Sequence, residues 1–411
     1  MKQTCISSPT QNKTTIIVTM QPPPPPPQVH LVIDPTTTTD RRRHGGIIST
    51  PIFKQTILPI LSNFDAGYFR ITLSLCFQTL LLKTLSHPPE NPHPYRKLLA
   101  AIPSAALLLL WSISFLTLTS LSLLYLLRCA LFSSMVKREY LNHIKVNYLF
   151  APWISWLLLL QTSPFFKPQQ NLCHLFLFWV FVVPIFVLDV KIYGQWFIKG
   201  KRFLSTVGNP ASQLTVIGNF VGAGTAAEMG WKESGMVMFT VGIVHYVVVF
   251  VTLYQRLKGE SCMPVMLRPV MFLFVGAPSM GSLAWDSING SFDCSSKMLF
   301  YLALFLFFSL VSRPNLFKKS MRKFDVVWWA YSYPLTLLAL ASTEYAHEMK
   351  SSVAHLLMLI LSALSVLVSC VLMVYTAFNT NILLPGDDDD VILITLKPII
   401  ISNTSSDSLT S

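Results

Sequence analysis

The sequence predicts an all-α integral membrane protein of ten transmembrane helices, and three observations carry this prediction. Ten apolar stretches fill residues 53–379, and most reach the roughly 20 residues that ~30 Å of hydrocarbon requires. Hydrophobic residues make up 52% of the 411-residue chain and charged residues only 12%, about half the charged fraction of a soluble domain. Lys and Arg gather in alternate loops between the stretches. Lipid must therefore solvate most of the chain.

The chain divides into three expected parts. Residues 1–50 combine a proline run, a threonine run and a basic triplet with few aromatic residues, so we expect a disordered cytosolic tail. Residues 51–385 contain all ten apolar stretches, and we expect them to form the transmembrane domain. Residues 386–411 contain four consecutive aspartates, Asp387–Asp390, directly after Gly386, and we expect them to form a second cytosolic tail.

The expected spans follow one another with mostly short loops, and an even number places both termini on one side. With cytosolic termini, the cytosolic loops hold 16 Lys and Arg against 7 in the external loops. This bias is typical of the cytosolic side of a membrane protein. The spans cover residues 53–82, 98–127, 144–162, 172–198, 213–230, 233–255, 266–286, 297–312, 325–344 and 352–378.

Each of the five odd-numbered spans carries a residue that weakens a helix, whereas the even-numbered spans are mostly plain Leu- and Phe-rich stretches. Pro184 in the fourth span is an exception to this alternation. Proline deletes a backbone hydrogen bond, and backbone groups freed at membrane depth are tolerated only where protein or water satisfies them. We therefore expect five helical hairpins, with the odd-numbered helices lining a central pore and the even-numbered helices outside them. In the alternative, these residues only kink packed helices. The residues are Gly67, Pro152, Gly218, Gly222, Gly224, Pro278 and Pro334.

Several long motifs lie in and beside the spans. They include FDAGYFRITLSLC from Phe64, HIKVNYLFAPW from His143, LDVKIYGQW from Leu188, NPASQLTVIGNFVGA from Asn209, AEMGWKES from Ala227, APSMGSLAWDSI from Ala277 and WWAYSYPLTLLALASTEYA from Trp328. These motifs resemble the plant slow (S-type) anion channels over about residues 51–386, and most of all the short-tailed homologues of the guard-cell channel. The wider family includes bacterial TehA-like proteins and C4-dicarboxylate carriers.

The resemblance implies a homotrimer in which each subunit has its own pore. It also implies a plasma-membrane channel that passes chloride and nitrate, and a phenylalanine gate just before the proline of the ninth span. Tyr333 stands at that position, directly before Pro334, and its hydroxyl needs a partner or water when buried. Phe150, two residues before Pro152, is a second candidate for the pore gate. In the alternative, Phe150 is a core-packing residue.

Arg70 is the charged side chain of most interest, because it falls within the first expected span. An ionisable group at membrane depth is by default a functional hypothesis, which places Arg70 in the anion pathway. Alternatively, Arg70 lies near the cytosolic end and extends its guanidinium to the interface.

We expect neither an enzyme nor a cofactor. The histidines show no metal-ligand spacing, and the basic residues lie at helix ends and in loops rather than in an aromatic-interleaved patch, which disfavours nucleic-acid binding. The expected partners are inorganic anions, the lipid bilayer and other subunits. Two alternatives to a conducting channel remain: an electrically silent modulatory subunit that co-assembles with related channel subunits, and a TehA-like organic-anion (C4-dicarboxylate) carrier.

Overall fold

The computed structural model describes residues 58–86, 94, 103–165, 172–199, 208–256, 265–318, 320–322 and 324–379. Within these residues all regular secondary structure is helical, as the sequence predicts. The two expected tails, residues 1–50 and 386–411, lie outside the described residues.

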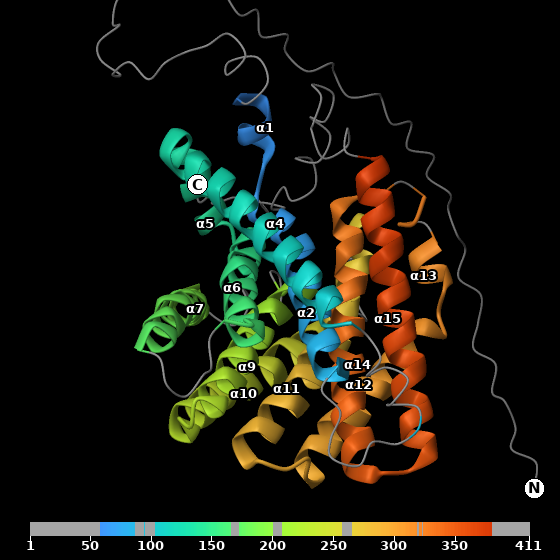
Figure 1. The fold of residues 1–411 in the computed structure, drawn as a ribbon. Coiled ribbons are helices and arrows are strands. Elements are labelled where there is room, and N and C mark those ends of the chain that lie inside the picture. The colour runs from blue at the N-terminus through green and yellow to red at the C-terminus, as the bar shows by residue number, and fades with distance from the viewer. Residues whose placement is uncertain are drawn as a thin grey trace, which may run out of the picture. The chain divides into compact units, whose positions relative to one another are not determined.

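Ten long helices in the described residues follow the order of the ten expected spans (Figure 1). They are α2 (Phe69–Ser86), α4 (Ser104–Leu131), α6 (Phe150–Thr162), α7 (Leu172–Lys199), α9 (Gln213–Glu228), α10 (Lys232–Arg256), α11 (Leu273–Asn289), α12 (Cys294–Val311), α14 (Trp329–Met349) and α15 (Ser352–Phe378). Three shorter α-helices accompany them, namely α1 (Leu58–Asn63), α5 (Ser133–Leu141) and α13 (Asn315–Lys318).

The prediction of one continuous first span over residues 53–82 is wrong. The chain leaves helical geometry after α1, and Asp65 is extended, with φ −130° and ψ 171°. Its side chain accepts a hydrogen bond from the Gly67 amide at 2.9 Å. An aspartate in this position starts a new helical segment because it satisfies an amide that has no intrahelical acceptor.

Five of the long helices, α4, α7, α10, α12 and α15, are long and apolar enough to cross a membrane by length and composition. Only 11% to 39% of their most apolar windows is buried inside the protein. Contiguous apolar surface of this extent marks contact with a membrane or a partner. Together with the family assignment below, these helices make the chain a multi-pass membrane protein.

The other five long helices, α2, α6, α9, α11 and α14, form the interior. Every residue of α9 from Gln213 to Ala227 is buried, and so is every residue of α14 from Trp329 to Thr343. These helices contact one another in the closed order α2, α6, α9, α11, α14 and back to α2. Each also contacts the long helix that follows it in the chain, as α14 does with α15 (Figure 1). The inner helices are the odd-numbered spans of the sequence.

A short 3-10 segment leads into each inner helix, and the five segments form a second closed ring. Each segment contacts the next one, and the last contacts the first. The amino-terminal ends of the five inner helices therefore lie together at one end of the bundle. The segments are η2 (Ala66–Tyr68), η3 (Lys145–Leu149), η4 (Pro210–Ser212), η5 (Val265–Phe272) and η6 (Val326–Trp328).

Three of these segments start in the same way. Asp65, Asn209 and Asp325 are extended residues whose side chains accept a hydrogen bond from the backbone amide two residues later. Short polar side chains are the preferred N-caps because they satisfy the free amides of the first turn. The sequence thus fixes where the inner helices begin.

The helix-weakening residues have more than one role in the structure. Pro278 and Pro334 lie inside α11 and α14, where each deletes an intrahelical hydrogen bond. Pro152 is the third residue of α6, so it lies in the first turn, where a proline costs no such bond. Gly67 belongs to η2 rather than to α2.

Glycines of α9 give room to neighbouring side chains. A Cβ atom added to Gly218 would lie 3.3 Å from Cδ1 of Phe150, and one added to Gly222 would collide with the Met238 side chain. Close approach of helices in membrane proteins relies on such small residues. In these contacts Gly218 and Gly222 act in helix packing.

Candidate functional site

Tyr333 lies in α14 and is completely buried. The adjacent face of α14 is held by hydroxyl contacts: the Ser332 and Ser369 hydroxyl oxygens are 2.7 Å apart, and the Thr336 hydroxyl accepts from Gln78 Nε2 at 2.9 Å. These bonds tie α14 to α15 and α2. The Tyr333 hydroxyl itself has no hydrogen-bond partner among the described residues.

Arg70 lies in the first turn of α2 and is only 7% exposed. Its Nε donates to the Gly67 carbonyl at 2.8 Å, and its guanidinium carbon sits 4.6 Å from the centre of the Tyr148 ring. Such stacking of a guanidinium on an aromatic face is favourable, and more so when it is desolvated. Its Nη1 atom is buried without a hydrogen-bond partner among the described residues.

Gly67 leaves room for the guanidinium group of Arg70. A Cβ atom at residue 67 would lie 2.6 Å from Nη2 of Arg70 and 2.8 Å from Oδ1 of Asp65. Real Cβ atoms essentially never show contacts this short, so any larger residue would displace the guanidinium or the carboxylate. The glycine that the sequence singles out as a helix-weakening residue therefore provides space for Arg70.

Tyr148 completes a cluster that sequence reasoning missed. It lies in η3, is buried, and its hydroxyl has no hydrogen-bond partner in the described part of the chain. Both Arg70 and Tyr148 interact electrostatically with the Tyr333 hydroxyl. The structure thus brings together Arg70 and Tyr333, two residues that the sequence singles out, and adds Tyr148 from a third segment.

Phe150 is fully buried in the first turn of α6 and contacts α9 at Gly218. This position favours the core-packing alternative that the sequence leaves open for Phe150.

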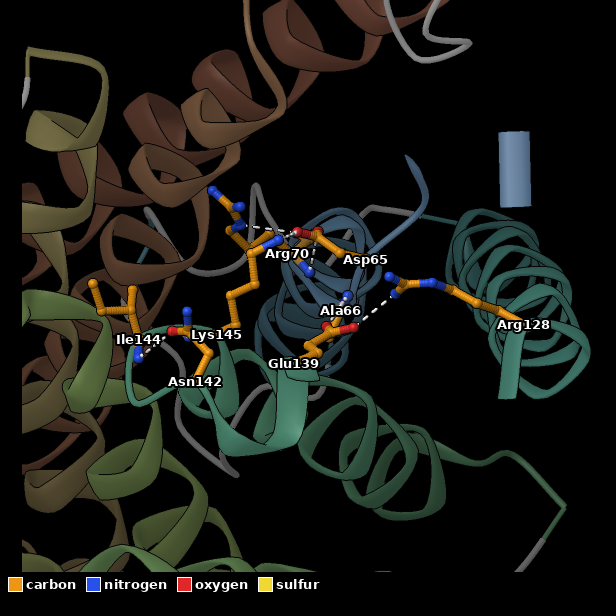
Figure 2. A network of polar contacts seen from close by, with 9 residues as sticks. Asp65, Ala66, Arg70, Arg128, Glu139, Asn142, Ile144 and Lys145 are labelled. Atoms are coloured by element: carbon orange, nitrogen blue, oxygen red, sulfur yellow. Dashed lines mark hydrogen bonds and ion pairs between the residues drawn. The ribbon is translucent and has the colours of Figure 1, made fainter. Parts of the chain in front are cut away.

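A polar network holds η2 in place (Figure 2). The network thereby positions the Gly67 carbonyl that accepts from Arg70. Glu139 of α5 accepts from the Ala66 amide at 2.9 Å and pairs with Arg128 of α4 at 2.7 Å. Both ionic side chains are buried. On the other side of η2, Lys145 pairs with Asp65 at 3.3 Å in a more exposed position. Two carboxylates thus satisfy the first amides of this segment.

This end of the bundle carries both negative and positive charge, because Asp65 and Asp325 cap two of its helical segments. Each helix carries roughly half a positive charge at its amino-terminal end, and five such ends converge at the ring of 3-10 segments. Arg70 and Lys145 lie at the same end. Within the described ranges, His, Cys, Asp and Glu side chains form no group of three or more that could hold a metal ion.

Comparison with known proteins agrees with this geometry. The family model for the voltage-dependent anion channel, SLAC1, matches residues 63–377. The S-type anion channel SLAH1 of Arabidopsis thaliana is 55% identical over 333 residues, which cover 80% of this chain and 85% of that protein. The guard cell S-type anion channel SLAC1 of the same plant is 40% identical over 338 residues, with 81% and 59% covered.

A more distant relative extends the similarity to bacteria. A tellurite resistance protein TehA homologue of Haemophilus influenzae is 24% identical over 285 residues, which cover 68% of this chain and 81% of that protein. The family comprises anion channels rather than enzymes. The resemblance to S-type anion channels is therefore confirmed, and the match includes all ten long helices almost in full. This chain belongs to the voltage-dependent anion channel family.

Proposed function

We propose that this protein is a slow, weakly voltage-dependent anion channel of the plasma membrane that passes chloride and nitrate. In this proposal it is a homotrimer with cytosolic termini, and each subunit has a pore inside its ring of five inner helices. The observation that carries the proposal is the closed ring of buried helices whose amino-terminal ends converge at one mouth.

The arrangement of charge explains why anions would pass. The positive ends of five helices and the basic side chains beside them raise the local anion concentration at that mouth. The positive-inside bias of the loops supports a cytosolic position for this mouth, because Lys145 and η3 follow the second span. The outer helices then face lipid with their exposed apolar side chains.

Tyr333 is the proposed gate. An aromatic ring in a narrow apolar neck blocks ions by excluding water, and moving the ring aside hydrates the path. The ring of Tyr333 is completely buried in the inner helix α14, directly before the proline that interrupts the hydrogen bonding of that helix. The hydrogen bond that Pro334 removes gives α14 a place to bend when the ring moves.

Voltage clamp of cells that express this chain tests the proposal. We expect little current from the unmodified protein and a clear current from Tyr333→Ala, in chloride and in nitrate. Tyr246→Ala is the matched control, because Tyr246 is also buried with an unpartnered hydroxyl but lies on the outer helix α10. The control should stay silent. A Tyr333→Ala protein that reaches the cell surface and carries no current would contradict the gate.

A silent modulatory subunit is the second candidate, and the buried Tyr333 ring supports it. Such a subunit would change the current of a co-expressed S-type channel while carrying none itself. A C4-dicarboxylate carrier would instead show saturating organic-anion flux without single-channel steps.

A further inference from the structure

We propose that Arg70, Tyr148 and Tyr333 form a binding site for one monovalent inorganic anion at the cytosolic side of the gate. This inference rests on the proposed function and names the place where the transported ion pauses. Arg70 would contribute Nη1, and each tyrosine would contribute its hydroxyl group.

Arg70 has no carboxylate in salt-bridge contact among the residues that the structure describes. The ion pairs of Arg128 with Glu139, Lys145 with Asp65, and Lys297 with Glu348 do not include it. Arg70 is nevertheless 93% buried, since its exposed fraction is 7%. A buried charge is costly unless it is paired. An anion beside Nη1 would supply the missing charge.

Three unpartnered donors belong to side chains that lie near one another. Nη1 of Arg70 and the hydroxyls of Tyr148 and Tyr333 are all buried without hydrogen-bond partners among the described residues. The guanidinium lies on the Tyr148 ring, and both residues act electrostatically on the Tyr333 hydroxyl. Buried polar groups in folded proteins almost always have a partner, so such a convergence needs an explanation. A bound anion accepts from all three.

The nearest carboxylates limit the charge of the ligand. Asp65 and Asp325 act electrostatically on Tyr148, but one oxygen of each already accepts from an N-cap amide, at Gly67 and Val327 respectively. Asp65 is also paired with Lys145. Their residual negative charge would oppose a multiply charged ligand more strongly than a monovalent one. It would also keep binding weak enough for the ion to leave, which conduction requires.

The site also gives the Tyr333 hydroxyl a role. A phenylalanine ring could exclude water equally well, but it would offer the ion no hydrogen bond. With tyrosine, the same side chain closes the path and binds the waiting anion.

Anion-dependent stability of the purified full-length protein tests the site without relying on current. A ligand that binds only the folded protein raises its melting temperature as the ligand concentration increases. Chloride and nitrate would each be titrated against gluconate at constant ionic strength, and the two arms report which anion the site prefers. We expect a saturable rise in the unmodified protein.

Single-oxygen variants locate the effect. Tyr148→Phe and Tyr333→Phe each remove one hydroxyl and should weaken the apparent anion affinity roughly tenfold, as expected for a hydrogen bond to a charged group. Arg70→Gln should abolish the saturable rise. Tyr246→Phe removes an equally buried hydroxyl elsewhere, and Lys145→Gln removes an exposed charge at the same mouth. The Tyr246→Phe control should bind anions as the unmodified protein does, and Lys145→Gln should weaken anion binding less than either single-oxygen variant does.

Two results would overturn the inference. One is unchanged anion affinity in both Tyr148→Phe and Tyr333→Phe, and the other is an equal loss in Lys145→Gln, which would indicate a general surface field. If Arg70→Gln fails to fold, the two tyrosine variants decide the question, since each loses a single oxygen atom. Failure of the proposed channel function is read separately, from absent current in Tyr333→Ala. A protein that carries no current but still binds anions through these three residues would contradict the channel function and support the anion site.

Discussion

The buried ion pair between Arg128 and Glu139 offers the sharpest test of how η2 and Arg70 are held (Figure 2). The side chains are 6% and 3% exposed, and the ion-pair distance is 2.7 Å. Glu139 also accepts from the Ala66 amide with its other carboxylate oxygen. The pair therefore links α4 and α5 to the segment that leads into α2.

Removal of one partner should cost far more than removal of both. Glu139→Leu leaves the Arg128 guanidinium buried and uncompensated, which costs about 3–5 kcal/mol, and it leaves the Ala66 amide without its acceptor, which costs a further ~1–3 kcal/mol. Arg128→Met leaves a buried carboxylate at a similar cost of about 3–5 kcal/mol. The double variant retains only the amide penalty of roughly 1–3 kcal/mol.

The assay is the thermal midpoint of the detergent-solubilised protein, measured for both single variants and the double variant. We expect both single variants to melt well below the unmodified protein, and the double variant to melt above either of them. Lys145→Met is the matched control, because its pair with Asp65 is half exposed and exposed pairs contribute about 0–1 kcal/mol.

Two outcomes would refute this reasoning. If the two single losses simply added in the double variant, the two side chains would be energetically independent. If Glu139→Leu melted within the range of the Lys145→Met control, water would reach the pair and its burial would have no energetic consequence.

Two further predictions concern packing and capping. A Cβ atom at Gly276 would lie 3.2 Å from Cβ of Pro334, so Gly276→Ala should lower stability by about 1–3 kcal/mol, while Gly224→Ala, whose nearest contact is 3.7 Å, should be tolerated in the same melting assay. Asp293 caps α12 and accepts from the Trp285 indole, so Asp293→Ala should cost about 1 kcal/mol. Although partial burial raises the pKa of Asp293, hydrogen bonds from the first amides of α12 lower it overall. The loss should therefore be seen above pH 3.8, the ordinary value, and fade as pH falls through the folded-state pKa.

Hydropathy separated the inner and outer helices better than the placement of proline and glycine did, since Pro184 lies inside the outer helix α7. The five helices that are long and apolar enough to cross a membrane are the even-numbered spans, and the inner helices carry Gly67, Pro152, Gly218, Pro278 and Pro334 in or directly before them. The outer helices face lipid and the inner helices face protein, so the two groups differ in amino-acid composition. The break between α1 and α2 was missed because the apolar pattern continues across it, whereas Asp65 interrupts the helix through one capping bond.

The sequence by itself determined that this chain is a multi-pass membrane protein of the anion channel family, since apolar runs and long motifs can be read without knowing which segments touch. Only the tertiary structure decided that Arg70, Tyr148 and Tyr333 meet, because they come from α2, η3 and α14. Their meeting depends on how each helix is rotated within the ring, and that rotation is set by contacts between distant segments. The same contacts decided the role of Gly67. The guanidinium of Arg70 lies in the space that a side chain at residue 67 would need.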